Sequence, residues 1–510
     1  MDPPQPGSPS GGTVYLVGAG PGDPGLITLR GAELLQSADL ILYDNLTSAD
    51  VLALARPDAE RLYVGKKRAK HTYTQGEIND LMIKAARAGR SVVRLKGGDP
   101  YVFGRGGEEA RAMADSGVPF EVVPGVTSAL GVAAYAGMPL THRDHTRVVT
   151  MLNGHDIDSI DWKLMAGRQT LVVFMGLMSF KAIARRLIDA GLDRATPSAA
   201  VRWVTRGDQQ VVPGTLGDLP AKVAAMGLKP PALVVIGEIV RLRERIDWFA
   251  KLPLRGQSVV VTRAASQSRP FCEQLRRLGA NVIAIPTIEF EEPLDWGPAD
   301  AAIGNLSDYA FVVFTSVNGV DRFLARLDAS EHDLRDLPSR ICAIGPATEN
   351  RLQQLHLRVD VLPEEFVAES LVEALEALDM NGSKVLLPRA QDARELLPAK
   401  LAELGATVDV VPVYRTVLPE SSRELAHEAW RADRAPDWVT VTSSSTVRNL
   451  AELVPIDDLR RSKLASIGPV TSGTARELGL RVLAEASPFT TDGLAKALCA
   501  AVQSAFASDA

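Results

Sequence analysis

A short apolar segment that runs into a glycine-rich loop is the feature that most constrains this chain. Residues 91–95 have the composition of a strand end, and residues 97–107 contain five glycines and one proline among alternating charges. Glycine allows a positive φ and a close approach of the backbone to a ligand. A long surface loop without a ligand is the alternative interpretation. We interpret the loop as part of a ligand site, because its acids can hold hydroxyl groups and its arginines can hold carboxylates.

Three further apolar segments precede the loop and alternate with segments of helical spacing. The apolar segments cover residues 13–18, 40–44 and 61–67, and helical spacing recurs at 26–37 and 75–88. Strands that alternate with helices predict a parallel α/β sheet. Residues just past the carboxyl ends of such strands line the ligand crevice. Four charged residues occupy these positions: Asp23, Asp44, Lys66 and Asp99.

The first of these turns disfavours an oxidoreductase that binds a dinucleotide. Residues 18–25 approach the GxGxxG fingerprint, but Asp23 stands where the third glycine is required. Pro21 and Pro24 also lack the N–H groups that would donate to a phosphate. Two later apolar segments, at 170–176 and 231–237, predict a second α/β layer.

Bulk properties exclude several classes of partner. A length of 510 residues predicts roughly three or four domains. The net charge of −6 gives no general reason to bind nucleic acid or an anionic membrane, and no apolar run reaches the ~18 residues of a membrane-spanning helix. Residues 1–12, rich in Pro, Gly and Ser, are expected to be a disordered lead-in and not a signal peptide. The three cysteines are far apart, so no metal site is expected, and a cytoplasmic location fits.

The second half of the chain contains an internal duplication. Gly279 within Leu-Gly-Ala recurs 126 positions later as Gly405, and the Ile-Gly-Pro turn at 344–346 recurs at 467–469. Two similar α/β lobes with a cleft between them are therefore predicted. The proline-bearing segments 283–293 and 409–419 are expected to form an exposed two-stranded connection between the lobes, not a sheet centre. One lobe is then discontinuous, at about 256–285 plus 420–505, and the other covers about 296–408.

Eight ordered motifs in the first half resemble the uroporphyrinogen-III C-methyltransferases of the tetrapyrrole methylase family. They are VGAGPGDPGLITLRG, LYDNL, YVGK, VRLKGGDPYVFGRGGEE, VVPGVTSA, PLTHR, VFMG and PALVVIG. The resemblance covers residues 13–248, with subdomains at about 13–140 and 141–248, and residues 249–255 form a linker. It implies a homodimer and two methyl transfers from S-adenosyl-L-methionine to a tetrapyrrole, which give precorrin-2. Both the sirohaem and the cobalamin branch stay open.

The same resemblance assigns residues to the site. It implies that Asp44 accepts a proton and that Lys66 donates one. It implies cofactor contacts at Pro21, Gly97, Gly98, Asp99, Val102, Thr127, Ser128, Met175, Val204 and Ala232. The segment 201–205 departs from the glycine-bearing pattern of the family, which affects Val204. A polycarboxylate substrate needs cations, and the expected cationic wall consists of Arg94, Lys96, Arg105, Arg143 and Arg147.

The second half resembles uroporphyrinogen-III synthase over residues 256–505. The matching motifs are VTRA, GANVIAIPTIEF, FTSVNGV, AIGPAT, LLPRA, GATVDVVPVYRT, VTSSSTV and SIGPVTSGTARELGL. The family closes hydroxymethylbilane into a macrocycle, inverts the last ring and uses no cofactor. The resemblance implies that Tyr414 donates a proton to the leaving hydroxyl and that Thr471 lies near the cleft. The candidate carboxylate binders are Arg263, Thr315, Ser316, Ser443, Ser444 and Gly468.

The fusion predicts a bifunctional enzyme in which one half supplies the substrate of the other. An active methyltransferase with a non-catalytic tetrapyrrole-binding module is the alternative. For Tyr414, a half-buried strand tyrosine without a catalytic role is the structural alternative. A periplasmic-type binding protein would also have two lobes, but the N-terminus shows no export signal.

Overall fold

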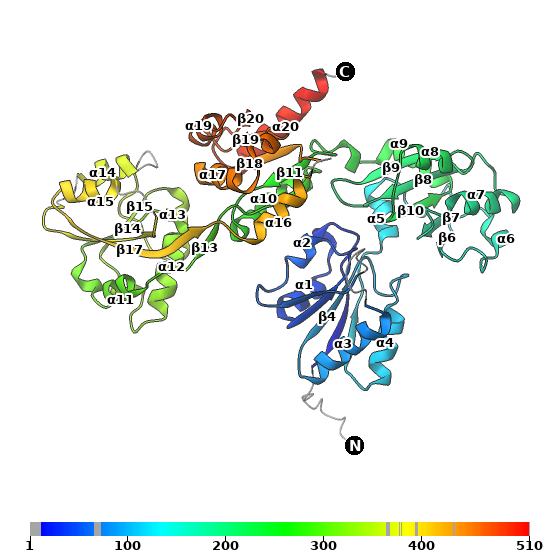
Figure 1. Ribbon diagram of the computed structural model, residues 1–510, viewed down its shortest axis with the longest axis horizontal. Helices are drawn as coiled ribbons and strands as arrows, with labels where there is room; N and C mark the ends of the chain where they lie inside the picture. Colours follow the sequence, from blue (N-terminus) through cyan, green and yellow to red (C-terminus); the bar gives the residue numbers. More distant parts are fainter. Residues whose placement is uncertain are drawn as a thin grey trace. The chain divides into compact units, whose positions relative to one another are not determined.

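The computed structural model describes residues 12–65, 73–363, 368–376, 378, 380–392, 396–431 and 434–508. Residues 1–11 of the expected lead-in and Lys66 lie outside them. The chain divides into two compact units. One extends to Val259 and takes in Glu273–Val282 and the chain from Cys499 onward, and the other comprises Val260–Cys272 and Ile283–Leu498. Within the described residues the strands form four five-stranded sheets (Figure 1).

The first sheet is parallel throughout, as the sequence predicts. Its strand order is β3-β2-β4-β1-β5, and every neighbouring pair is parallel. The strands are β1 Val14–Gly18, β2 Leu40–Tyr43, β3 Glu60–Tyr63, β4 Val92–Lys96 and β5 Phe120–Val123. The helices of this part are α1 Leu29–Ser37, α2 Ala49–Leu52, α3 Gln75–Arg87 and α4 Gly106–Asp115. Because β1 and β4 are neighbours, the two glycine-rich turns that follow them lie side by side.

Alternate residues of these strands enter two different core clusters. Leu16 packs in one cluster with Met82 of α3, and Val17 packs in the other with Leu35 of α1. The period of two follows from the pleat, which directs successive side chains to opposite faces. Helix α3 begins at a capping box in which Thr74 and Glu77 bond each other's backbone N–H.

The second sheet is mixed. Its order is β6-β7-β10-β8-β9. Strands β6 and β7 pair in parallel, and the other pairs are antiparallel. The strands are β6 Val149–Asn153, β7 Thr170–Phe174, β8 Pro197–Arg202, β9 Gln210–Thr215 and β10 Ala232–Ile236. The helices are α5 Ser128–Tyr135, α6 Trp162–Met165, α7 Phe180–Asp189, α8 Leu219–Ala225 and α9 Arg243–Ile246. Ala129 and Val132 of α5 pack against this sheet.

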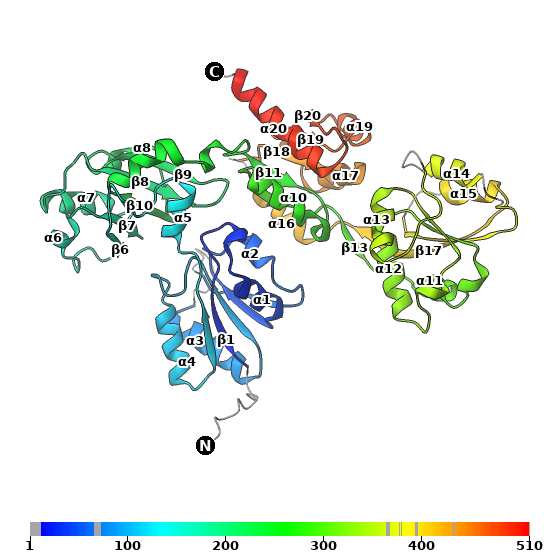
Figure 2. The same cartoon turned by 180° about the vertical axis from the view of Figure 1, so that it is seen from behind.

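The third sheet takes strands from two separated stretches of sequence. Its order is β12-β11-β18-β19-β20, seen from both sides in Figures 1 and 2. The strands are β11 Ser258–Val261, β12 Asn281–Ala284, β18 Trp438–Val441, β19 Lys463–Ser466 and β20 Val482–Glu485. The helices are α10 Ala265–Arg277, α16 Ser421–Ala429, α17 Ser444–Leu453, α18 Ile456–Leu459, α19 Pro469–Glu477 and α20 Thr491–Ser508. This lobe is therefore discontinuous, as predicted.

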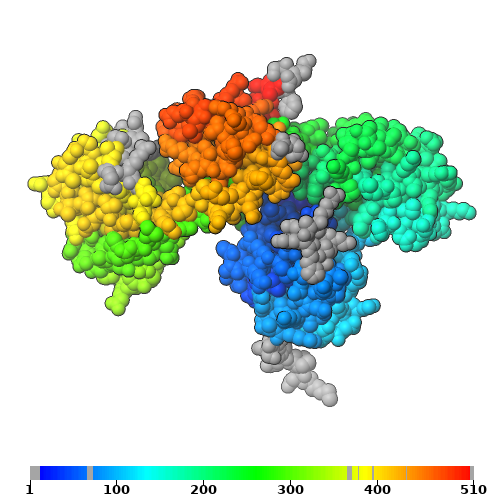
Figure 3. Space-filling model, in the orientation of Figure 1, coloured from blue at the N-terminus to red at the C-terminus, as the bar shows by residue number. Residues whose placement is uncertain are grey.

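The fourth sheet is built from the intervening sequence, with the order β13-β17-β16-β14-β15. The strands are β13 Glu289–Glu291, β14 Phe311–Phe314, β15 Arg340–Ala343, β16 Lys384–Ala390 and β17 Thr407–Val417. The helices are α11 Gly297–Ile303, α12 Val317–Asp328, α13 Pro346–Gln354, α14 Ala368–Glu376 and α15 Leu396–Glu403. This lobe is coloured green to yellow in the space-filling view (Figure 3).

The expectation for the segment 409–419 is wrong in one respect. Strand β17 lies inside the fourth sheet, between β16 and β13, and is not merely an exposed connection. Its proline is tolerated because β13 pairs only with residues 415–417, so Pro412 has a partner strand on one side alone. A register shift occurs beside it, where Ala390 pairs with Tyr414 and Val413 is skipped.

Among the described residues, every helix is too short or too polar to cross a lipid bilayer.

Candidate functional site

Three turns of the first sheet meet through their backbones. The N–H of Gly20 donates to the carbonyl of Gly98 at 3.2 Å, and the N–H of Gly98 donates back at 2.8 Å. Gly98 has a φ of +70°. A Cβ on Gly125 would lie 2.3 Å from the Gly98 oxygen, and the obstructing atom is backbone. Glycine is required at these positions because no side-chain movement could relieve that overlap.

A cavity of about 330 Å³ opens at these turns. Its walls include the turns after β1 and β4, the start of α5, and the ends of β7, β8 and β10. Seven of the ten expected cofactor contacts line it: Pro21, Gly97, Gly98, Ser128, Met175, Val204 and Ala232. The volume lies within the range of small-molecule sites.

The other three expected contacts are not among the lining residues and support the cavity from behind. The carboxylate of Asp99 accepts hydrogen bonds from the N–H groups of Tyr101 at 2.8 Å and Gly125 at 3.0 Å, which joins two of the turns. Thr127 is buried and precedes α5. Val102 packs against the core of the second sheet.

Sequence reasoning missed several lining residues that flank the motifs. They are Gly20, Leu46, Phe174, Leu177, Met178, Val201, Trp203, Pro230, Pro231 and Leu233. Proximity in sequence to a matched motif was a usable signal for most of them. Val201 and Trp203 are the exceptions, since they lie in the segment that departs from the family pattern.

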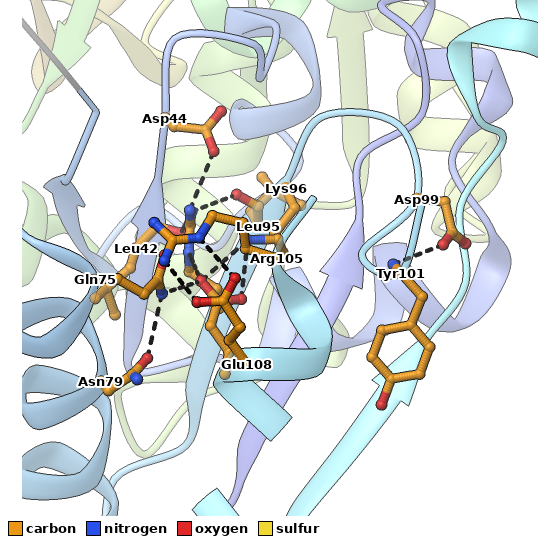
Figure 4. Close-up of polar contacts among 12 residues, drawn as sticks. Leu42, Asp44, Gln75, Asn79, Leu95, Lys96, Asp99, Tyr101, Arg105 and Glu108 are labelled. Carbon is orange, nitrogen blue, oxygen red and sulfur yellow. Dashed lines mark hydrogen bonds and ion pairs between the residues drawn. The ribbon is translucent and has the colours of Figure 1, made fainter. Parts of the chain in front are cut away.

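Asp44 lies on a loop that forms one wall of this cavity. Its carboxylate accepts a hydrogen bond from the N–H of Leu46 at 3.0 Å, and Leu46 lines the cavity. A Cβ on Gly97 would lie 2.5 Å from the Cβ of Leu46, so the loop is pressed against the turn after β4. Arg94 donates to the other carboxylate oxygen of Asp44 at 3.1 Å (Figure 4).

A buried ion network continues from Asp44 into the sheet. Glu109 of α4, fully buried, accepts from Arg94 at 3.2 Å and from Lys96 at 3.0 Å. Gln75 of α3 donates to the same carboxylate at 3.0 Å. Burial lowers the pKa of the Lys96 ammonium, the neighbouring charge of Arg94 lowers it further, and Glu109 acts in the opposite direction. Two positive charges thus face the two negative charges of Asp44 and Glu109.

The expected cationic wall is revised by this network. Arg94 and Lys96 are only 5% and 4% exposed and bond to acids of the protein, so they are not presented at a surface. Arg105 is exposed and donates to Glu108 at 2.9 and 2.6 Å, and Arg143 is also exposed. Arg94 and Lys96 lie on β4 among buried residues, and cations in a buried strand are rare unless paired. That signal was available in the sequence.

Tyr414 is held in the fourth sheet. Its hydroxyl lies 3.1 Å from the hydroxyl of Ser316, and its ring packs edge-on against Phe290 with centroids 5.5 Å apart. The side chain is buried. Burial raises the pKa of the Tyr414 phenol, and the bond to Ser316 partly opposes that shift. A protonated phenol at this position is therefore favoured at neutral pH.

The two lobes repeat the same capping arrangement. Ser316 follows β14 and accepts from the N–H of Gly319 at the start of α12. Ser443 follows β18 and accepts from the N–H of Thr446 at the start of α17. The remaining candidates divide between the sheets. Thr315 lies with Ser316 and Tyr414 at the fourth sheet, whereas Arg263, Ser443, Ser444, Gly468 and Thr471 belong to the third.

Three further third-sheet candidates lie at the ends of the strands or helices of this sheet. Arg263 follows β11, and burial lowers the pKa of its guanidinium. Ser444 accepts from the hydroxyl of Thr474 at 2.8 Å. Thr471 is buried in the first turn of α19.

Two family models match the chain. "Tetrapyrrole (Corrin/Porphyrin) Methylases" matches residues 13–220 and "Uroporphyrinogen-III synthase HemD" matches residues 270–496. Among curated relatives, the porphyrin biosynthesis protein HemD of Ruminiclostridium josui is 36% identical over 486 residues, which is 93% of this chain and 96% of the relative. Siroheme synthase 1 of Pectobacterium atrosepticum is 55% identical over 244 residues, 47% of this chain and 50% of that protein. The chain thus spans about half the length of this siroheme synthase.

Solved structures of both kinds are similar to parts of the chain. The uroporphyrin-III C-methyl transferase of Thermus thermophilus, complexed with S-adenyl homocysteine, is 44% identical, with coverage of 45% of this chain and 100% of that chain and a TM-score of 0.40. A mutant uroporphyrinogen III synthase of Thermus thermophilus is 18% identical, with coverage of 49% and 99% and a TM-score of 0.40. Together with the relative that matches almost the whole chain, the two family models show that this chain belongs to the porphyrin-biosynthesis family in which a tetrapyrrole methylase of the uroporphyrinogen-III C-methyltransferase type is fused to a uroporphyrinogen-III synthase.

Proposed function

We propose that the chain makes uroporphyrinogen III from hydroxymethylbilane, with inversion of ring D, and then methylates that product twice to precorrin-2. One observation carries the proposal: one cavity is lined by seven of the residues that the family resemblance assigns to the cofactor, in a chain related over 93% of its length to a porphyrin biosynthesis protein. The coarser assignment, a tetrapyrrole-biosynthesis enzyme of both types, follows from the family.

S-adenosyl-L-methionine is the proposed methyl donor, and it supplies an electrophilic methyl group when bound. The cavity suits it because the lining combines apolar side chains with the glycine backbone of two turns and the hydroxyl-bearing Ser128. The lining residues Pro21, Gly97, Gly98, Ser128, Met175, Val204 and Ala232 would hold it. Asp99, Val102 and Thr127 are proposed to act by shaping the turns.

Asp44 is the proposed base. A pyrrole carbon that gains a methyl group carries positive charge until a proton leaves, and a nearby carboxylate can stabilise that charge and accept the proton. Two contacts support this role: the bond to Leu46, which lines the cavity, and the bond to Arg94, which fixes the orientation of the carboxylate. Lys66 as proton donor remains a prediction.

Tyr414 is the proposed acid for ring closure. The hydroxyl of hydroxymethylbilane must depart as water, which requires a proton, and a tyrosine phenol carries a proton at neutral pH. Ser316 orients the phenol at 3.1 Å. Arg263, Thr315, Ser443, Ser444, Gly468 and Thr471 are proposed carboxylate binders, and Arg105 and Arg143 keep this role in the first half.

The test uses the full chain with hydroxymethylbilane, with and without S-adenosylmethionine. We expect the inverted isomer in both cases and the absorbance of precorrin-2 only with the methyl donor. Asp44→Asn should lower methylation by about 10²- to 10⁴-fold, as loss of a general base does, and leave ring closure unchanged. Closure without inversion by the wild-type chain would favour the non-catalytic module. Loss of both activities in Asp44→Asn would contradict the division of labour.

Further properties complete the proposal. The partners are small-molecule tetrapyrroles, the first half forms a homodimer, and the location is cytoplasmic. Sedimentation of the purified chain at several concentrations tests the dimer directly.

A further inference from the structure

Trp203 is a cavity residue that none of the motifs singled out. It directly follows β8, lines the cavity and has a φ of +51°. A bulky side chain rarely adopts this left-handed conformation. Backbone strain of this kind persists where the surroundings determine the conformation, and it concentrates at ligand sites. The strained backbone and the position of the ring at the cavity both indicate a role of the indole in ligand binding.

Contacts behind the cavity hold the indole in place. The guanidinium carbon of Arg206 lies 4.3 Å from the ring centroid, and Arg206 also donates to Asp208 at 3.0 Å. A Cβ on Gly22 would lie 2.9 Å from the Cγ of Arg206, so the arginine packs against the turn after β1. Thr205 accepts a hydrogen bond from the N–H of Asp23 at 2.9 Å. The segment that carries Trp203 is thus tied to the first sheet before any ligand binds.

The cavity lining combines apolar side chains with exposed backbone. The residues that neighbour Trp203 in sequence or across the β8–β10 pair are apolar: Val201, Val204, Pro231 and Leu233. The turns after β1 and β4 contribute the backbone of Gly20, Gly97 and Gly98. A ligand with a planar aromatic base at one end and a charged chain at the other matches this arrangement. An indole fixed in an apolar wall offers a stacking surface to the base.

We propose that Trp203 stacks on the purine base of the methyl donor and selects for it. This inference rests on the proposed function, because it takes a purine nucleoside as the ligand of the cavity. Two guanidinium carbons lie near the ring centroid, that of Arg206 at 4.3 Å and that of Arg202 at 5.4 Å, and cation–π contact of this kind favours a fixed orientation. Little side-chain freedom then remains to be lost on binding, so the stacking contributes directly to affinity.

The first test is the binding of S-adenosylhomocysteine to the full chain, measured by calorimetry. Base–aromatic stacking predicts about 5- to 150-fold weaker binding for Trp203→Leu. Trp203→Phe keeps an aromatic ring and should bind within about fivefold of wild type. Trp248→Leu is the matched control, because this indole is half exposed and is not among the cavity-lining residues. It should leave binding unchanged.

Trp203→Gly separates the ring from the backbone. Glycine relieves the left-handed strain, so the thermal midpoint should not fall on that account. Binding should nevertheless be as weak as in Trp203→Leu. Wild-type affinity in Trp203→Gly would show that only the backbone conformation matters and would overturn the proposal.

A second ligand distinguishes stacking from other contacts. S-ribosylhomocysteine has the same chain and sugar but no base, so Trp203→Leu should weaken only the binding of S-adenosylhomocysteine. An equal loss for both ligands would overturn the assignment of Trp203 to the base while the proposed function stands. Failure of the wild-type chain to bind S-adenosylhomocysteine would overturn the proposed function and this inference together.

Discussion

Glu109 is the position at which a single substitution should test the buried ion network most severely. Its carboxylate has no exposed surface and holds both Arg94 and Lys96. Glu109→Gln keeps the shape of the side chain but removes one of the two negative charges. Arg94 retains Asp44 at 3.1 Å, whereas Glu109 is the acid that bonds Lys96. The substitution therefore leaves mainly the ammonium group of Lys96 buried without an acidic partner.

The stability lost in Glu109→Gln can be calculated in two ways. Removal of one partner from a buried ion pair destabilises a protein by about 3–5 kcal/mol. Lys96 can instead release its proton, and from an ordinary pKa of 10.5 this costs about 5 kcal/mol at pH 7, at 1.36 kcal/mol per unit. Both calculations give a loss of about 3–5 kcal/mol for Glu109→Gln. Glu108→Gln is the matched control, since its exposed carboxylate forms an ion pair with the exposed Arg105, and its effect on stability should be small.

Native-state hydrogen exchange of the β4 amides, Val92–Lys96, is the suitable assay. Global unfolding of a chain with several domains is not a two-state process, whereas exchange reports the opening of one strand. We expect the opening free energy of β4 to fall by about 3–5 kcal/mol in Glu109→Gln. A fall of less than about 1 kcal/mol would refute the reasoning, because the two cations would then not depend on Glu109.

The stability lost in Glu109→Gln should depend on pH. The folded pKa of Lys96 is lowered below 10.5, so between the two values the unfolded chain binds more protons than the folded chain. Stability contributed by this group therefore rises with pH in that window. Glu109→Gln removes an interaction that raises the pKa of Lys96 in the folded chain. The stability that the variant loses relative to wild type should therefore shrink as the pH rises from 7 toward 10.5. The measurement is the thermal midpoint of both proteins across this pH range. A deficit that grows with pH would contradict this assignment.

Two further substitutions, one of them with a matched control, test the remaining parts of the site. Tyr414→Phe should cost about 1 kcal/mol of stability, the value of a lost hydrogen bond, and slow ring closure by about 10²- to 10⁴-fold; inversion at the wild-type rate, read from the product isomer, would exclude the phenol as the acid. Gly125→Ala should lower the thermal midpoint and abolish binding of S-adenosylhomocysteine, because the new Cβ would lie 2.3 Å from the Gly98 oxygen. Gly107→Ala, where the Cβ meets nothing within 4 Å, should instead stabilise helix α4 by up to about 1 kcal/mol. Equal effects of the two alanines would show that the backbone contact is unimportant.

The parallel first sheet could be predicted because its signals are local. Strands β1, β2 and β4 are mainly apolar runs, and a glycine or a charged residue ends each run or directly follows it. The glycines of the site could be predicted for the same reason. A close approach of two backbone segments requires glycine, and glycine is apparent in the sequence. The path of β17 was not predictable in this way. Pro412 correctly indicated a strand that lacks one neighbour, but that neighbour is missing along only part of β17.

Side-chain contacts between residues far apart in the chain were harder to predict from the sequence. Trp203 lies in a segment that matches no motif, and only the pairing of β8 with β10 brings it beside Pro231 and Ala232. Glu109 formed part of a recognised motif, but nothing in the sequence shows that α4 directs it against β4. Arg94 and Lys96 were consequently assigned to a substrate, whereas in the structure both are buried and pair with Glu109.

The buried network is better explained by geometry at Asp44 than by stability. A buried group of ions is often no more stable than apolar residues of the same volume, because each charge loses its hydration. Apolar residues on β4 would remove that penalty. They could not, however, hold the Asp44 carboxylate, which depends on Arg94 reaching from Glu109 to the loop beside Leu46. We therefore expect Glu109→Gln to reduce methylation at temperatures where the sheet is still folded, while ring closure is unaffected. Full methylation by a destabilised but folded Glu109→Gln chain would mean that the network serves the sheet alone.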